Sequence, residues 1–176
     1  MTERQEFKVL QTYDGFELRE YLPCVIAEVR VSSQYSNATS KAFSSLFNYI
    51  SKGNKSAQKI SMTAPVIAAQ NVAGSDSDVW YVSFVMPSGS AFGHLPNPND
   101  PQVKLRELTK EICVAKSFRG RATDEQAHKI AEILRVSAAK ASIALSSETR
   151  ICRFDPPFKP GFLQYNEIVI PAFPEN

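Results

Sequence analysis

The feature that most constrains the fold of this chain is an order of elements that occurs twice. Each half, about 7–87 and 102–172, is predicted to contain two strands, one helix and two more strands, and an extra hairpin arm precedes the first set. The tripeptide Leu-Arg-Glu also occurs at 18–20 and at 105–107. This repetition predicts a pseudo-twofold α+β domain in which mostly antiparallel strands form a curved sheet or barrel flanked by two helices.

The strands are predicted from alternating apolar and polar side chains and from turn residues. A hairpin is expected at 7–21, turning at Asp14-Gly15, and a turn at 71–78. In the strand predicted at 59–66 we expect four side chains to face the core: Ile60, Met62, Ala64 and Val66. The remaining strands are predicted at 25–31, 79–86, 103–108, 112–118, 149–154 and 163–170.

Two helices are predicted from apolar residues at helical spacing. The first, at 39–52, carries a stripe that includes Phe43, Leu46 and Phe47. The second, at 123–141, begins with Thr123 and Gln126, which form a capping box. A proline-rich stretch at 87–101 is predicted to be a long surface loop.

Size and charge narrow the classes of partner. With 176 residues, of which 43% are hydrophobic and 22% charged, the chain has the composition of one globular domain spanning 1–176. Its formal charge of +2 is too balanced to favour nucleic acid or an anionic membrane. No run reaches the about 18 apolar residues of a membrane span. We expect a cytoplasmic protein, or an organellar one if a transit peptide was removed.

Candidate catalytic and metal-binding residues are few. Cys24, Cys113 and Cys152 lie in apolar runs without a ligand spacing, which favours buried reduced thiols. His94 lies in the proline-rich loop and His128 on the polar side of the second helix, and neither belongs to a ligand motif. No motif of a serine hydrolase, zinc protease or nucleotide-binding enzyme occurs. The residues therefore support no enzyme class, although they exclude none.

The apolar stripe of the first helix has two interpretations. Phe43, Leu46 and Phe47 would serve as core packing, as in any amphipathic helix. Beside Lys41 and Lys55 they would equally suit an apolar groove for a flat hydrophobic ligand that carries carboxylates. The pattern leaves both interpretations open.

Several motifs together resemble the SOUL heme-binding protein family over nearly the whole length. They are the Lys-Ile-x-Met-Thr-x-Pro-Val motif at 59–66, the Tyr-Glu-Arg-Tyr pattern at 13–21, the aromatic strand at 80–87, Phe-x-Gly at 118–120, Asp-Pro-Pro at 155–157 and Asn-Glu-Ile at 166–168. The resemblance implies an eight-stranded twisted antiparallel sheet with two flanking helices. It also implies non-covalent binding of heme or a related tetrapyrrole in a shallow apolar surface pocket beside the first helix, as a carrier, buffer or sensor.

The resemblance also implies site residues. Pocket-lining apolar positions of the family fall on Phe43, Leu46 and Phe47, whereas basic positions that meet the heme propionates fall on Ser40 and Asn48. A tyrosine before the Asp-Pro-Pro turn becomes Phe154, a possible aromatic wall, and charge would come from Lys41 or Lys55. The histidine proposed as iron ligand in one branch has no counterpart near 34–39, so the axial ligand is unknown.

Two other functions stay open at this point. The predicted fold resembles small-molecule-binding effector domains of bacterial regulators, so the groove would suit a peptide or a drug-like molecule, as a sensor or interaction module. An enzyme that modifies tetrapyrroles or hydrolyses a small molecule would need a carboxylate pair that converges in the pocket. The residues predict no particular protein partner.

Overall fold

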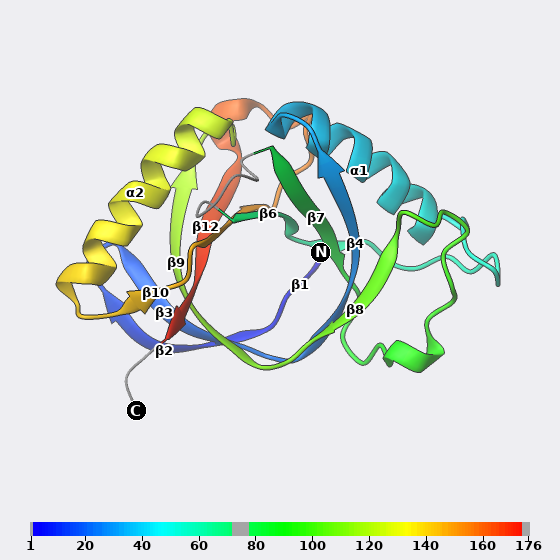
Figure 1. Ribbon diagram of the computed structural model, residues 1–176, viewed down its shortest axis with the longest axis horizontal. Helices are drawn as coiled ribbons and strands as arrows, with labels where there is room; N and C mark the ends of the chain where they lie inside the picture. The colour runs from blue at the N-terminus through cyan, green and yellow to red at the C-terminus, as the bar shows by residue number, and fades with distance from the viewer. Residues whose placement is uncertain (1, 72–77, 174–176) are drawn as a thin grey trace.

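The fold is a large curled sheet with two helices on its outer side (Figure 1). The computed structural model describes residues 2–71 and 78–173, so the predicted turn at 71–78 lies mostly outside the described residues. Helix α1 spans Tyr35–Ile50 and helix α2 spans Asp124–Lys140. The strands are β1 (Glu3–Arg4), β2 (Phe7–Tyr13), β3 (Phe16–Tyr21), β4 (Cys24–Ser32), β5 (Thr63–Ala64), β6 (Val66–Asn71), β7 (Val79–Val85), β8 (Lys104–Leu108), β9 (Glu111–Arg119), β10 (Ala144–Leu145), β11 (Glu148–Arg153) and β12 (Tyr165–Phe173).

The order of strands confirms the pseudo-twofold repeat. The main sheet runs β2-β3-β9-β12-β11-β6-β7-β4-β8, with β10 beside β12, and its described strand pairs are antiparallel. Strands β3, β4, β6 and β7 of the first half correspond to β8, β9, β11 and β12 of the second half. If each strand is replaced by its counterpart, the order read from one end of the sheet becomes the order read from the other end. These eight strands match the predicted number, and β2 and β10 extend the sheet to ten. The two Leu-Arg-Glu tripeptides lie in the equivalent strands β3 and β8.

Each face of the sheet has its own apolar cluster, because successive side chains of a strand point to opposite sides. The outer cluster fills the space between sheet and helices, and it contains Leu46, Val82, Leu134 and Ile168, each 0% exposed. A smaller inner cluster includes Tyr21, Ile26, Ile67, Cys113 and Cys152. The three cysteines are free; Cys113 and Cys152 are buried, whereas Cys24 is half-buried. Burial raises the pKa of Cys113 to about 12, which keeps its thiol protonated.

The prediction of a strand at 59–66 is wrong for most of that segment. Only Thr63–Ala64 and the segment from Val66 onward are strands, and they belong to different sheets, β5 pairing with β1 and β6 with β7 and β11. Pro65 separates them because it has no N–H for the ladder, and the peptide bond before it is cis. Of the four side chains expected in the core, Ile60, Ala64 and Val66 are buried as predicted, whereas Met62 is 37% exposed.

The helix boundaries differ in how well the sequence marks them. Helix α2 begins as predicted, and the Thr123 side chain accepts a hydrogen bond from the Gln126 N–H at 3.2 Å. Helix α1 begins at Tyr35, four residues before the predicted start. The sequence does not reveal this start, because the N-cap residue Gln34 forms no side-chain capping hydrogen bond and glutamine is not a residue type that marks a helix start. Neither helix of the described residues combines the length and hydropathy of a membrane-spanning segment.

Candidate functional site

A large cavity lies on the helix side of the sheet, and we call it the outer cavity. It has a volume of about 1190 Å³ and is lined by α1 from Tyr35 to Phe47, by Asp124 at the start of α2, and by residues of β6, β7 and β11. Strands β6 and β11 are the central pair of the palindromic strand order. The outer cavity therefore lies at the pseudo-twofold axis, where the two helices begin near one another (Figure 1).

One wall of the outer cavity is aromatic. The rings of Phe43 and Phe47 are stacked, with centroids 5.9 Å apart and planes 12° apart. Phe43 also meets the buried ring of Phe84 edge-on at 5.4 Å, which holds it against the core. Phe47 is 49% exposed, and Met62 and Phe154 add further apolar lining. This surface suits a flat apolar ligand.

Tyr35 contributes the most unusual polar atom of the outer cavity. The residue is 7% exposed, and its ring packs against Trp80 with centroids 5.0 Å apart. Its hydroxyl is a buried side-chain oxygen without a hydrogen-bond partner among the residues that the structure describes. Burial raises the pKa of Tyr35, with the Arg153 charge acting in the opposite direction. The phenol is therefore protonated at neutral pH and can donate a hydrogen bond.

Charged groups of both signs also line the outer cavity. Arg121 and Arg153 form no ion pair within the described part of the chain. Asp155, by contrast, accepts hydrogen bonds from the Tyr165 backbone N–H at 2.7 Å and from Lys159 at 2.9 Å. These two hydrogen bonds lower the pKa of Asp155. The arginines are thus available to a ligand, whereas the Asp155 carboxylate is already engaged.

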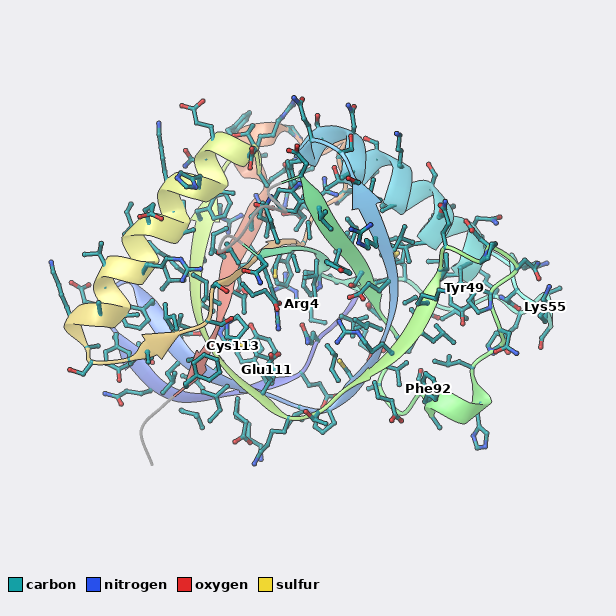
Figure 2. All side chains as sticks on the ribbon, viewed as in Figure 1. Arg4, Tyr49, Lys55, Phe92, Glu111 and Cys113 are labelled. Atoms are coloured by element: carbon teal, nitrogen blue, oxygen red, sulfur yellow. The ribbon has the colours of Figure 1, made fainter. Side chains whose placement is uncertain are left out.

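The structure brings together half of the predicted site residues. Ser40, Phe43, Phe47 and Phe154 line the outer cavity. Leu46 does not, since it is 0% exposed and packs in the outer core cluster. Lys41, Asn48 and Lys55 are exposed and lie outside the lining, with Lys55 beyond the far end of α1 (Figure 2).

Sequence reasoning missed several lining residues. Tyr35 lies before the helix predicted at 39–52, Met62 was expected in the core, and Trp80 was predicted only as part of the strand at 79–86. Arg121 and Arg153 belong to no motif of their own. Arg121 directly follows Phe-x-Gly, and Arg153 lies two residues before Asp-Pro-Pro. Position beside such motifs is the one signal that could have found the two arginines.

A second cavity lies inside the curl of the sheet, and we call it the inner cavity. Its volume is about 280 Å³. Arg19 donates to the two carboxylate oxygens of Glu167 at 2.7 and 3.1 Å, and the Tyr165 hydroxyl donates to Glu167 at 2.7 Å. The guanidinium of Arg4, which lies within the curl in Figure 2, stacks on the ring of Phe154 at 5.0 Å. Phe154 lines both cavities.

Neither cavity has the features of a metal site among the residues that the structure describes. Those residues contain no group of three or more histidine, cysteine or acidic side chains that could hold a metal ion. His94 and His128 are exposed and lie outside the lining of both cavities. The two histidines are therefore in the surface positions expected from the sequence.

Solved structures show which fold class this is. The chain is similar to the C-terminal domain of EcmrR (TM-score 0.69, 15% identity, 90% of this chain and 96% of that chain covered). It is also similar to a hydrolase from Listeria innocua (TM-score 0.59, 10% identity, 93% and 94% covered). A third similar structure is SAV2435 bound to tetraphenylphosphonium (TM-score 0.57, 10% identity, 90% and 93% covered). At these identities the likeness shows the fold alone.

The sequence itself defines the family. A family model described as SOUL heme-binding protein matches residues 2–171. The chain therefore belongs to the SOUL heme-binding protein family, in agreement with the resemblance found in its motifs. No curated protein sequence matches the chain.

Proposed function

We propose that the protein binds heme or a related tetrapyrrole non-covalently in the outer cavity, as a carrier, buffer or sensor. The observation that carries this proposal is the stacked pair Phe43 and Phe47 at the edge of a cavity of about 1190 Å³. A planar macrocycle can stack on the exposed ring of this pair, and the volume exceeds the few hundred cubic ångströms that small ligands need. Membership of a family described as heme-binding supports the same ligand class.

The residues of the outer cavity fit the macrocycle better than they fit the iron. Apolar contact comes from Phe43, Phe47 and Phe154. The lining side chains that could bind heme iron are the thioether of Met62 and the phenol of Tyr35, and burial disfavours the phenolate form of Tyr35. Heme bound here would supply an iron centre, while the chain supplies burial and orientation. Burying about 300 Å² at ~25 cal/mol per Å² gives roughly 7 kcal/mol before association costs. Micromolar affinity is therefore the ceiling without a bond to the iron.

A hemin titration followed by Soret absorbance tests the proposal. Phe47→Ala should weaken binding about tenfold because it removes half of the aromatic pair, a loss of about 1.4 kcal/mol. Phe92→Ala is the matched control, since Phe92 is 45% exposed, close to the 49% of Phe47, but lies in a short 3₁₀ helix outside the cavity (Figure 2). Equal affinity of wild type and Phe47→Ala would refute the site.

A second candidate is a sensor for apolar cations. Asp78, Asp124 and Asp155 also line the outer cavity, and the similar structure SAV2435 contains tetraphenylphosphonium. Titration with tetraphenylphosphonium separates the candidates. Saturable binding of this cation, together with no preference for porphyrins over unrelated apolar ligands, would favour the sensor.

A further inference from the structure

We propose that the outer cavity binds one carboxylate of its ligand at the start of α1, where the Tyr35 hydroxyl donates a hydrogen bond and Arg153 supplies positive charge. This inference rests on the outer cavity being the ligand site proposed above, and it specifies which group of the ligand the chain recognises. It places the carboxylate at the opposite end of α1 from the lysines of the linker that follows the helix, including Lys55.

The unpaired hydroxyl of Tyr35 is the first observation. Buried polar groups are nearly always hydrogen-bonded, because burying one without a partner costs free energy. A phenylalanine would pack against Trp80 equally well, at the 5.0 Å centroid distance of Tyr35, without that cost. Tyr35 lines the outer cavity, but its hydroxyl is covered in the ligand-free structure. A ligand that enters beside Tyr35 and moves the groups that cover the hydroxyl can supply the missing partner.

The protonation state of Tyr35 decides what that partner is. Burial raises the pKa of the phenol, so the hydroxyl keeps its proton at neutral pH. A protonated phenol on a cavity wall donates its hydrogen to an acceptor. The ligand group that meets Tyr35 should therefore be an oxygen acceptor.

Charges of both signs lie near Tyr35: Arg153 lowers its pKa, and Asp124, which also lines the cavity, raises it less strongly. Two features of the surroundings nevertheless favour an acceptor with negative charge. Arg153 lines the same cavity without an ion-pair partner in the described residues. The N-terminus of α1 has no side-chain cap and no acidic residue in its first turn, so its free N–H groups and helix dipole favour an anion. Helix α2 differs, because Thr123 caps it and Asp124 and Glu125 occupy its first turn.

The spacing along α1 restricts the ligand further. Phe43 lies eight residues after Tyr35, which is a rise of about 12 Å at 1.5 Å per residue. A ligand that touches both the aromatic pair and the start of α1 must be extended, with an apolar body and a carboxylate at its edge. Small carboxylates cannot span the two. Tetrapyrroles with carboxylate side chains fit this description.

Removing the Tyr35 hydroxyl tests the inference directly. Tyr35→Phe should bind iron-free protoporphyrin IX about tenfold more weakly than wild type, because a hydrogen bond to a charged group is lost. Its affinity for protoporphyrin IX dimethyl ester, which lacks the carboxylates, should stay the same. Fluorescence titration measures both. The melting temperature of the ligand-free Tyr35→Phe protein should rise, because a buried unpaired hydroxyl is gone.

Tyr49→Phe is the matched control. Tyr49 is also a buried tyrosine of α1, but its hydroxyl donates to the Pro96 carbonyl oxygen at 2.8 Å and it lies outside the outer cavity. Removing the Tyr49 hydroxyl should lower the melting temperature and leave porphyrin affinity unchanged. Arg153→Gln should weaken binding of protoporphyrin IX and spare the dimethyl ester.

Three outcomes would overturn the inference. They are unchanged affinity of Tyr35→Phe for protoporphyrin IX, an equal loss for acid and ester, or a loss for hemin only, which would indicate that the phenol binds iron. Pyrenebutyrate and its methyl ester separate this inference from the proposed function. If the wild type binds neither porphyrin but Tyr35→Phe weakens only pyrenebutyrate, the tetrapyrrole proposal fails and the carboxylate site stands. If Tyr35→Phe distinguishes neither acid from its ester, the carboxylate site is refuted.

Discussion

The outer and inner cavities differ in what their polar groups do. In the inner cavity Arg19 is held by Glu167, and Arg150 is held by Glu111 at 2.8 Å through two nitrogens. Burial opposes the charge of Arg19, yet its hydrogen bond to Glu167 raises its pKa, so the guanidinium stays charged. In the outer cavity the Tyr35 hydroxyl and the Arg153 guanidinium have no such partners among the described residues.

This difference suggests how to distinguish structural from ligand-binding polar groups. A buried group that already has its partners stabilises the fold, and removing one partner leaves an uncompensated charge. A buried group without a partner destabilises the empty protein and gains from a ligand. We therefore expect substitutions in the inner cavity to change stability, and substitutions of unpaired groups in the outer cavity to change affinity.

The largest effect should come from breaking the buried ion pair. Glu167→Gln removes the charge that balances Arg19, and the Arg19 and Glu167 side chains are nearly fully buried, at 7% and 5% exposure. We expect the free energy of unfolding to fall by about 3–5 kcal/mol. Urea denaturation measures this loss, and protoporphyrin affinity of the folded variant should stay within about twofold of wild type.

Glu17→Gln is the control for this variant. Glu17 contacts the same Arg19 at 2.7 Å but its side chain is 34% exposed, so its loss should cost about 1 kcal/mol or less. Equal losses for Glu167→Gln and Glu17→Gln would contradict the view that the inner cavity is held by its buried pair.

Two neighbouring residues of α1 sharpen the comparison on the helix side. Leu46 is 0% exposed and packs in the core, whereas Phe47 is 49% exposed and lines the outer cavity. Leu46→Ala should lower the free energy of unfolding by about 2–5 kcal/mol, with a smaller change for Phe47→Ala. Thermal or urea unfolding checks this order. A larger stability loss in Phe47→Ala would indicate that the exposed ring is part of the core.

The smallest effect should come from Asp155, a paired group in the outer cavity. Its pKa is lowered by the hydrogen bond from the Tyr165 N–H and then by that from Lys159. A lowered folded-state pKa stabilises the protein above the unfolded value of about 3.9, and this contribution is lost as pH falls through the folded value. Asp155→Asn should therefore cost about 1 kcal/mol at pH 7, since solvent screens the charge.

Acidification supplies the check on Asp155. Urea unfolding of wild type and Asp155→Asn between pH 7 and pH 2 should give stability curves that converge at low pH, where the wild-type carboxylate is protonated. Protoporphyrin affinity at pH 7 should change little, because the carboxylate is already paired. If wild type and Asp155→Asn still differ in stability at pH 2, the lost stability comes from packing of the Asp155 side chain and not from its charge.

Much of the fold could be predicted because its signals are local. Capping by Thr123, the aromatic stripe of α1 and the repeated order of elements all follow from residues close together in the chain. In the segment 59–66 the alternation predicts the burial of Ile60, Ala64 and Val66 but not one continuous strand, because Pro65 interrupts the ladder. Residues 60–62 have no strand pairing, and Met62 is turned to the outer cavity instead.

The site was less predictable because it is assembled from distant segments. Phe43, Phe47 and Phe154 could be inferred from the family motifs. Tyr35 could not, since nothing in its neighbourhood marks a helix start and its unpaired hydroxyl is a property of the folded environment. Arg153 is ordinary in sequence, and its importance depends on its having no ion-pair partner among the described residues, which is a property of the folded structure.

The shape of the outer cavity bears on stoichiometry and on ligand orientation. The cavity extends along α1, which contributes six lining residues, whereas α2 contributes only Asp124. The two halves of the chain therefore offer different surfaces to an entering molecule. Gln34 leaves the start of α1 uncapped, whereas Thr123 closes the start of α2, so a ligand with one acidic edge should bind one per chain and in a single orientation.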